Sequence, residues 1–326
     1  MQMNRRKFFA STGLSAAGLI VSESLFGINS KVETAQASTS ALAGRYDIMK
    51  EVMKYPKIDA HVHVDLGNSD PAAQKKFAEV LIDYADRLNI RKLVLSKPVT
   101  RLIKGIPDGS VEAFIDHNNI ILGVMKLHPD RFTGSFTFNP VHLKESMDEI
   151  KRCVDQGMVG AKTYYQTKIS DPAFYPIVEK MIDLKMIIHT HAETQLGVGG
   201  YRMIYDGRKP LNVSIPEDFV AIAKRYPEGM FQHAHIGGGG DWEYMCKALK
   251  HSPNVYVDTS GSNNEEWMID FALQELGEDR LLFGSDNMYY QSVGKILASN
   301  LNESQRKKIF FENFNNILRK GGHHVD

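Results

Sequence analysis

Short apolar runs alternate with amphipathic stretches from residue 57 to residue 319. The apolar runs are bounded by turn residues and predict buried strands, whereas the amphipathic stretches predict helices. The predicted strands are Lys57–Val64, Lys92–Ser96, Gly134–Asn139, Met158–Thr163, Met186–Thr190, Met230–His235, Val255–Thr259 and Leu281–Ser285. The predicted helices include Ala72–Leu88, Leu143–Gln156, Phe174–Leu184, Pro216–Arg225, Trp242–Lys250, Glu265–Leu276 and Ser304–Arg319.

Each strand–helix unit has about the length of one βα repeat. Eight such units predict an α/β fold, a single-domain (β/α)8 TIM barrel over residues 54–326. The alternative is a doubly wound sheet, which would require a glycine-rich turn after the first strand. The first strand ends instead in His61-Val62-His63, and the glycine run Gly237–Gly240 follows the sixth strand. The pattern therefore favours the barrel.

The first 37 residues are typical of an export signal. Basic residues Arg5, Arg6 and Lys7 precede a moderately apolar stretch, and Ala35-Gln36-Ala37 offers a small-residue cleavage pattern. The paired arginines resemble a twin-arginine signal. The apolar stretch is too short and polar for a stable membrane span. We therefore expect cleavage near Ala37, a linker over 38–53, and a periplasmic or extracellular protein with no membrane anchor.

Composition narrows the set of partners. The chain has 326 residues, with 39 basic and 39 acidic side chains, so net charge gives no reason to expect nucleic acid. Two cysteines, Cys153 and Cys246, are too few for a disulfide framework and are expected to be separate thiols. We expect a small-molecule partner, and the oligomeric state stays open. The twelve histidines carry most of the functional information.

Half of these histidines fall in His-x-His pairs at the carboxyl ends of predicted strands. The pairs are His61/His63, His189/His191 and His233/His235, and Asp286 follows the eighth strand. Residues two apart on a strand share a face, and the carboxyl ends of barrel strands converge where active sites form. Neutral imidazoles and carboxylates bind zinc-like ions, so the pattern predicts a metal site. Spacing alone leaves His191 and His233 as eligible as His189 and His235.

The motifs resemble the metal-dependent amidohydrolase superfamily, specifically its amidohydrolase-related branch, across most of residues 56–318. That branch also contains zinc decarboxylases similar to aminocarboxymuconate-semialdehyde decarboxylase. The motifs that carry the resemblance are Ile58-Asp59-Ala60-His61-Val62-His63, His128-Pro129-Asp130-Arg131-Phe132, Val159-Gly160-Ala161-Lys162, Ile188-His189-Thr190, Ala234-His235-Ile236-Gly237-Gly238 and Phe283-Gly284-Ser285-Asp286. The first and the last of these motifs together are quite specific.

The resemblance implies a ligand set and a reaction. It implies that His61, His63, His189 and Asp286 hold one divalent ion, expected to be Zn2+, whose bound water becomes a nucleophile. Asp286 then accepts the water's proton and returns it to the leaving group, and His235 acts as an electrophile or acid–base group. The leading expectation is hydrolysis of a C–N or C–O bond in an amide, cyclic amide or lactone.

Five further side chains have open roles. Lys162 resembles the lysine whose carbamate bridges a second metal in some superfamily members, but it could equally bind a substrate carboxylate or form an ion pair. His191 replaces a glycine usual in the branch, and it could line the substrate pocket or be a hydrogen-bonded loop residue. Tyr164 could line the same pocket or cap the barrel. Asp258 could support the metal ligands or cap the next helix. Asp59 is expected to orient an imidazole.

Two other functions remain open on these residues. A metal-dependent decarboxylase of an unsaturated or aromatic acid would use the same ligands, because the ion can bind substrate while a protonated group delivers H⁺ to carbon. A non-catalytic barrel that binds metal or ligand would be expected to lack a ligand. All four ligand positions are filled, which favours an enzyme.

Overall fold

The computed structural model describes residues 47–99, 102–103, 106–107, 109–193, 212–238 and 241–326. The predicted signal peptide and most of the predicted linker lie outside these ranges. Eight parallel strands form one sheet, and its strand order follows the chain. They are β1 (Lys57–His63), β2 (Ile90–Ser96), β5 (Phe132–Phe136), β6 (Gly160–Thr163), β7 (Ile187–Thr190), β8 (Met230–His233), β9 (Val255–Asp258) and β10 (Leu281–Leu282).

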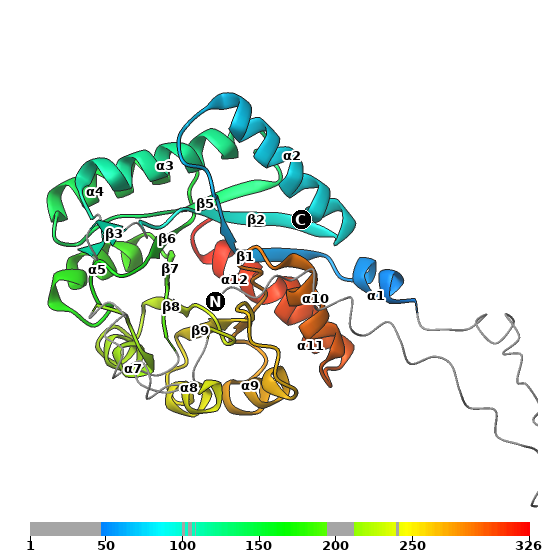
Figure 1. The fold of residues 1–326 in the computed structure, drawn as a ribbon. Coiled ribbons are helices and arrows are strands. Elements are labelled where there is room, and N and C mark those ends of the chain that lie inside the picture. Colours follow the sequence, from blue (N-terminus) through cyan, green and yellow to red (C-terminus); the bar gives the residue numbers. More distant parts are fainter. Residues whose placement is uncertain (1–46, 100–101, 104–105, 108, 194–211, 239–240) are drawn as a thin grey trace, which may run out of the picture. The chain divides into compact units, whose positions relative to one another are not determined.

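Two backbone hydrogen bonds bring the last strand back to the first. Ala60 N donates to Phe283 O at 2.9 Å, and Asp286 N donates to His61 O at 2.8 Å. The sheet therefore curls into a nearly closed barrel, seen along its axis in Figure 1. The predicted (β/α)8 TIM barrel is confirmed.

Helices surround the strands in the alternating order that the sequence predicts (Figure 1). They are α1 (Ile48–Lys54), α2 (Pro71–Arg87), α3 (Val111–Met125), α4 (Leu143–Asp155), α5 (Tyr175–Asp183), α7 (Pro216–Arg225), α8 (Trp242–Leu249), α9 (Met268–Leu276), α10 (Tyr289–Ala298), α11 (Glu303–Lys307) and α12 (Asn313–Lys320). None of the helices in the described ranges is long and apolar enough to cross a membrane.

Helix α2 shows how local sequence produces these elements. Asp70 caps the helix by accepting a hydrogen bond from Ala73 N at 2.9 Å, and Pro71 occupies the first turn, where its missing N–H costs nothing. Its buried residues are Gln74, Ala78, Leu81 and Ala85, which recur at the spacing of one helical face. That face packs on the sheet, and the opposite face is exposed.

Several elements differ from the sequence predictions. Helices α3 and α10 were not predicted, and in α3 the apolar residues occupy more than one face and hide the helical period. A two-stranded hairpin, β3 (Leu102–Ile103) and β4 (Ile106–Pro107), lies outside the barrel sheet. The predicted helix Ser304–Arg319 is α11 and α12 joined by a π-helical turn at Lys308–Glu312.

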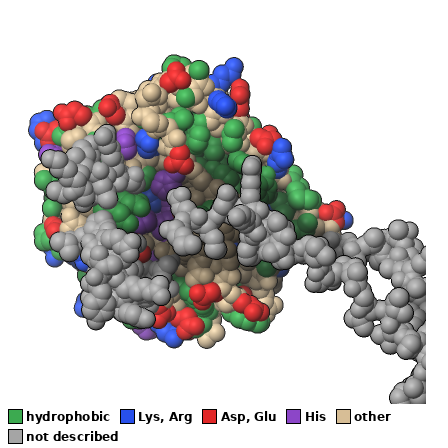
Figure 2. Space-filling model, in the orientation of Figure 1, with side chains coloured by type: hydrophobic (Ala, Val, Ile, Leu, Met, Phe, Trp, Pro, Cys, Tyr) green, Lys and Arg blue, Asp and Glu red, His purple; other side chains and the backbone are tan. Residues whose placement is uncertain are grey.

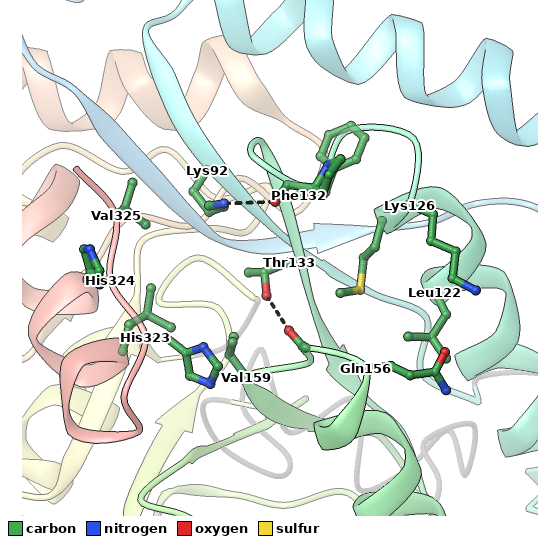
Figure 3. Close-up of a pocket in the computed structure, with 14 residues that line it drawn as sticks. Lys92, Leu122, Lys126, Phe132, Thr133, Gln156, Val159, His323, His324 and Val325 are labelled. Carbon is green, nitrogen blue, oxygen red and sulfur yellow. Dashed lines mark hydrogen bonds between the residues drawn. The ribbon is translucent and has the colours of Figure 1, made fainter.

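The amino end of the barrel is filled by apolar side chains and covered by the end of the chain. A buried cluster joins residues of the strands, such as Val94 and Ile187, to Phe314 of α12. The Asn315 side chain pairs with both backbone groups of Val325, at 2.8 and 2.9 Å, and so holds the final residues in place. These residues border a recess of about 280 Å³ that also includes Lys92 and Phe132 (Figure 3). This end serves stability, and the predicted site lies at the other end.

Candidate metal centre

His61 and His63, on β1, come together with Asp286, which follows β10. The two Nε2 atoms lie 3.1 Å apart, and Asp286 Oδ1 lies 3.1 Å from His63 Nε2 and 3.6 Å from His61 Nε2. Ligands about 2.0–2.2 Å from a divalent ion stand roughly 3.0–3.4 Å from one another. The three donor atoms therefore fit one divalent ion without rearrangement of the backbone.

A second group of potential donors shares His61. Asp258, at the end of β9, places Oδ2 at 3.1 Å from His61 Nδ1 and 3.3 Å from His189 Nε2. His189 therefore lies with His61 and Asp258, and it is not part of the triad of His61, His63 and Asp286. The four ligands predicted from the sequence lie at the same end of the barrel, divided between two overlapping groups.

Lys162 lies between the two groups. Its Nζ is 3.0 Å from His61 Nε2 and 2.9 Å from His189 Nε2, and the side chain is fully buried at the end of β6. Burial lowers the pKa of Lys162 to about 7. The amine lies between the two imidazole nitrogens and contacts both rings directly. The bridging role of Lys162 stays a prediction.

The protonation states of the surrounding side chains suit a cation. Burial and the charge of Lys162 hold the pKa of His61 and that of His189 well below the usual value, so both rings are neutral and have a lone pair to offer. Burial alone would raise the pKa of Asp286, but the hydrogen bond from His63 and the neighbouring imidazoles hold it below its usual value. Neutral imidazoles beside an ionised carboxylate are the donor set that zinc and similar ions prefer.

The third His-x-His pair divides between two faces. His233, the last residue of β8, points outward and packs on Phe219 of α7, with ring centroids 4.7 Å apart. The chain then turns, and His235 adopts a left-handed backbone with φ of +70°. His235 Nδ1 thereby comes within 3.0 Å of Ser260 Oγ and 3.6 Å of Asp286 Oδ2. Because β8 ends before His235, the strand alternation that made the two histidines equivalent does not apply.

Two glycines allow this turn. Gly261, after β9, has φ of +100°, and a Cβ on it would lie 2.3 Å from the carbonyl carbon of Gly237. The loops after β8 and β9 are also joined by a hydrogen bond from Gly237 N to Ser260 O at 3.0 Å. This close approach holds His235 against Ser260. Asp286 and Asn287 are left-handed as well, with φ of +50° and +62°.

Comparison with known proteins identifies the family. The amidohydrolase family model matches residues 58–313. The chain belongs to the amidohydrolase family. Among curated protein sequences, none matches the chain.

Several solved structures resemble this amidohydrolase in fold. The 2,6-dihydroxybenzoate decarboxylase from Rhizobium has a TM-score of 0.63 at 18% identity, covering 81% of this chain and 99% of that one. A dihydroxybenzoic acid decarboxylase from Polaromonas, solved with manganese and an inhibitor, has a TM-score of 0.60 at 18% identity, covering 81% and 97%. The 4-oxalomesaconate hydratase from Rhodopseudomonas palustris has a TM-score of 0.60 at 18% identity, covering 81% and 96%. At these identities the likeness concerns the fold.

A cavity of about 300 Å³ opens beside the donor triad of this amidohydrolase. Histidine side chains are visible in the hollowed middle of this face in Figure 2. Tyr164 and His191, both expected in the pocket, line the cavity with their rings stacked at 4.0 Å between centroids. Lys97 and Asp65 also line it and were missed, because single charged residues after a strand carry no distinctive pattern. The cavity thus has an aromatic wall and a cation beside the metal donors.

Asp59 differs from its predicted role. Its Oδ1 accepts hydrogen bonds from Ser285 N at 2.9 Å and His61 N at 3.1 Å, so it binds backbone and not an imidazole. The pairing of β1 with β2 shifts register between Asp59 and Val62, which breaks the strict alternation on which the prediction rested. Asp59 therefore joins β1 to the turn after β10, where Asp286 begins its left-handed backbone.

Proposed function

We propose that this member of the amidohydrolase family is a metal-dependent enzyme that removes the carboxylate of a small planar acid. The observation that carries the proposal is Lys97 in the cavity wall beside the donor triad. The Lys97 ammonium donates to Val64 O at 3.4 Å, a weak contact that leaves it able to bind a further acceptor. A substrate carboxylate between this cation and the metal donors would be held at both sides.

Further support comes from the shape of the cavity and from the neighbours in fold. The stacked Tyr164 and His191 offer a flat surface to a planar substrate. Two of the structures compared above are decarboxylases of dihydroxybenzoic acids, one of which contains manganese. A hydratase with the same fold shows that other reactions are compatible with the barrel.

The chain's own residues have separable tasks in this reaction. A bound divalent ion would supply positive charge that draws electrons from the substrate as the C–C bond breaks. Lys97 would bind the anion, and the ring of Tyr164 would fix its plane. CO2 leaves with one bond broken, and the carbon must gain a proton in exchange. His235 and Asp286 line the cavity and are the groups placed to deliver that proton.

Hydrolysis of a C–N or C–O bond is the second candidate, and Asp286 favours it. Its Oδ1 faces the His63 ring and its Oδ2 faces His235, so one carboxylate contacts both a predicted ligand and a predicted acid–base group. The low pKa keeps the Asp286 carboxylate ionised, so it could accept a proton from a water molecule whose acidity a bound divalent ion would raise. The two candidates share their ligands and differ in the need for a substrate carboxylate.

Metal identity and number are also part of the proposal. We propose one Zn2+ per chain, held by His61, His63 and Asp286, with His189 completing the set, and a second ion only if Lys162 becomes a bridging carbamate. The test is the metal content of the full chain, purified without a histidine tag, beside a His61→Ala/His63→Ala variant. About one ion per chain in the parent and none in the variant is expected. Absence of stoichiometric metal after incubation with zinc, manganese and iron would overturn the proposal.

The reaction is tested by measuring CO2 release from small aromatic and unsaturated acids, beginning with 2,6-dihydroxybenzoate, against hydrolysis of amides, cyclic amides and lactones. We expect CO2 release, with KM for the acid raised about tenfold in Lys97→Met, equivalent to ~1.4 kcal/mol. Lys92→Met is the matched control, since Lys92 lies on β2, which Lys97 follows, and borders the recess at the opposite end. If the protein turned over only the amides, cyclic amides or lactones, decarboxylation would be rejected and hydrolysis would become the proposed reaction.

Export is a separate proposal. We infer that residues 1–37 direct the chain through the twin-arginine route and are cleaved near Ala37. This segment lies outside the described residues, so the support is its sequence alone. Amino-terminal sequencing of periplasmic protein from cells expressing the full chain tests it, with Arg5→Lys/Arg6→Lys as the variant. A mature protein that begins near Ser38, and accumulation of uncleaved precursor in the variant, are expected.

A further inference from the structure

Five side chains form one continuous line of hydrogen bonds from the cavity wall to the metal donors. Tyr165 OH lies 2.9 Å from His191 Nε2, and His191 Nδ1 lies 2.9 Å from His235 Nε2. His235 Nδ1 lies 3.0 Å from Ser260 Oγ, which in turn donates to Asp258 Oδ1 at 2.5 Å. These distances are all short enough for hydrogen bonds. The residues follow four different strands, β6 to β9, so the barrel assembles the line.

The direction of the line follows from its last member. Both oxygens of Asp258 face fixed donors, since Oδ1 accepts from the backbone N of His235 at 3.2 Å and of Ser260 at 3.1 Å, and Oδ2 accepts from Gln232 Nε2 at 2.9 Å, so the carboxylate acts as an acceptor. The Ser260 hydroxyl donates its one proton to Asp258, and its oxygen therefore accepts a hydrogen bond from His235 Nδ1–H. A neutral His235 then has a lone pair on Nε2, which accepts from His191 Nδ1–H. His191 Nε2 likewise accepts from the Tyr165 hydroxyl. Each neutral group has one proton, and one assignment satisfies all four contacts.

We propose that Tyr165 and His191 are positioning residues that hold His235 with its proton on Nδ1, the side that faces Asp286 and Ser260. The proposal rests on the proposed function for its purpose, because it decides which nitrogen of His235 can donate at the reacting centre. His235 Nδ1 is 3.6 Å from Asp286 Oδ2, so an N–H there attracts the carboxylate, whereas a lone pair would repel it. The line thus fixes both the tautomer and the contact with a predicted metal ligand.

Ring packing keeps the line in register. The His191 ring stacks on Tyr164 with 4.0 Å between centroids, and it meets His235 edge-on at 4.9 Å. Stacking on Tyr164 fixes the plane of the His191 ring. The hydrogen bond from Tyr165 and the hydrogen bond to His235 then fix how the ring is rotated within that plane. The histidine at position 191, which the sequence marks as a departure from the usual glycine, is therefore the link that joins the cavity wall to His235.

The test uses the full chain labelled with 15N-histidine, both metal-free and loaded with zinc, and reads the tautomers from two-bond 1H–15N correlation spectra. His191→Gln and His235→Gln variants assign the peaks. We expect both rings to carry the proton on Nδ1 with an unprotonated Nε2. In Tyr165→Phe, which removes the first donor, we expect the His191 signals to move toward those of a tautomer mixture and the His235 signals to follow.

Tyr226→Phe is the matched control, because it removes a tyrosine hydroxyl that donates to Glu179, away from the line. It should leave both tautomers unchanged. A proton on Nε2 of either ring in the parent protein, a doubly protonated His191, or unchanged spectra in Tyr165→Phe would overturn the proposal. These outcomes differ from failure of the proposed function, which appears as missing metal or missing turnover. Tautomers as expected in a protein that does not release CO2 would leave the line intact and remove only its assigned use.

Discussion

The carboxylate of Asp258 lies 3.1 Å from the Nδ1 atom of His61, and both side chains are fully buried. The same carboxylate also accepts hydrogen bonds from Gln232 Nε2 at 2.9 Å and from the backbone N of His235 at 3.2 Å. An acceptor at Nδ1 requires His61 to carry its proton there, which leaves Nε2 unprotonated and directed toward His63 and Asp286. Asp258 thus orients the His61 ring so that Nε2 is the nitrogen that could bind an ion.

Replacement of Asp258 by Asn should weaken metal binding while preserving the fold. The amide keeps the shape of the carboxylate but lacks its charge, so His61 loses the partner that fixes its tautomer. We expect about a 10- to 100-fold loss of affinity, the usual effect of removing such a support. Competition with a chromogenic chelator measures it, and Asp83→Asn, on the exposed surface of α2, is the control. An affinity within about twofold of the parent would show that Asp258 has no such role.

Lys162 should make metal binding depend on pH. Its pKa is lowered to about 7 by burial, so it is positively charged below that pH and opposes a cation at the neighbouring imidazoles. We expect metal affinity to rise between pH 6 and pH 8 in the parent, and to be higher at pH 6 with a smaller rise in Lys162→Met. Each protein should hold one ion. A count that falls from two ions in the parent to one in the variant would instead establish a bridging lysine.

His233 should lower stability in mild acid. Burial lowers its pKa from 6.5 to about 4. Between these pH values the unfolded chain binds a proton that the folded chain does not, so the free energy of unfolding falls as pH falls, by about 3 kcal/mol in total.

His233→Leu should abolish this contribution, and urea denaturation at pH 7 and pH 5 tests the idea. The variant's advantage over the parent should grow as the pH is lowered. His251→Gln, which replaces an exposed histidine, should show the same pH dependence as the parent. Parallel stability curves for His233→Leu and the parent would contradict the expected role of His233.

Arg280 should be essential for the outer helices near β9. Its buried guanidinium donates to four backbone carbonyls at the ends of α8 and α9, namely Leu249, Lys250, Ser252 and Leu276, at 2.8–3.0 Å. Arg280→Met removes this donor from all four carbonyls, and we expect a loss of about 3 kcal/mol in the free energy of unfolding. Arg87→Met, at an exposed ion pair on α2, should cost under about 0.5 kcal/mol. A loss below about 1 kcal/mol at Arg280 would mean that water replaces its hydrogen bonds.

Strand alternation was sufficient to predict the barrel and the end at which the histidines gather. It succeeded for His61 and His63, whose Nε2 atoms meet at the end of β1, and it failed for His233 and His235, because the backbone leaves the strand between them. The period of a pattern is informative only while the secondary structure continues. Helix α3 was missed because its second half, Ile120–Met125, is apolar and buried on several sides, so the pattern there shows no helical period.

Residues defined by their partners were harder to predict. Asp258 and Ser260 are ordinary strand-end residues in the sequence, and only the closure of the barrel brings them to His61 and His235. Lys97 gives no signal either, since its relevance comes from the cavity that it borders. Two ligands on one strand form a pattern that can be recognised in the sequence. Residues that support the ligands come from strands distant in the sequence, so no local pattern predicts them.

His235 and Asp286 both adopt a left-handed backbone, so substitutions at these positions that raise heat resistance should differ from those that keep the site intact. Each such residue costs roughly 1–2 kcal/mol relative to a relaxed conformation, and glycine or asparagine at either position would recover part of it. A library of variants screened only for survival on heating should therefore accumulate Gly or Asn at positions 235 and 286. Screening for retained metal in the same library should eliminate those changes at position 286. Positions that change first in the heat screen and stay unchanged in the metal screen would be those where the native residue lowers stability but is needed for metal binding.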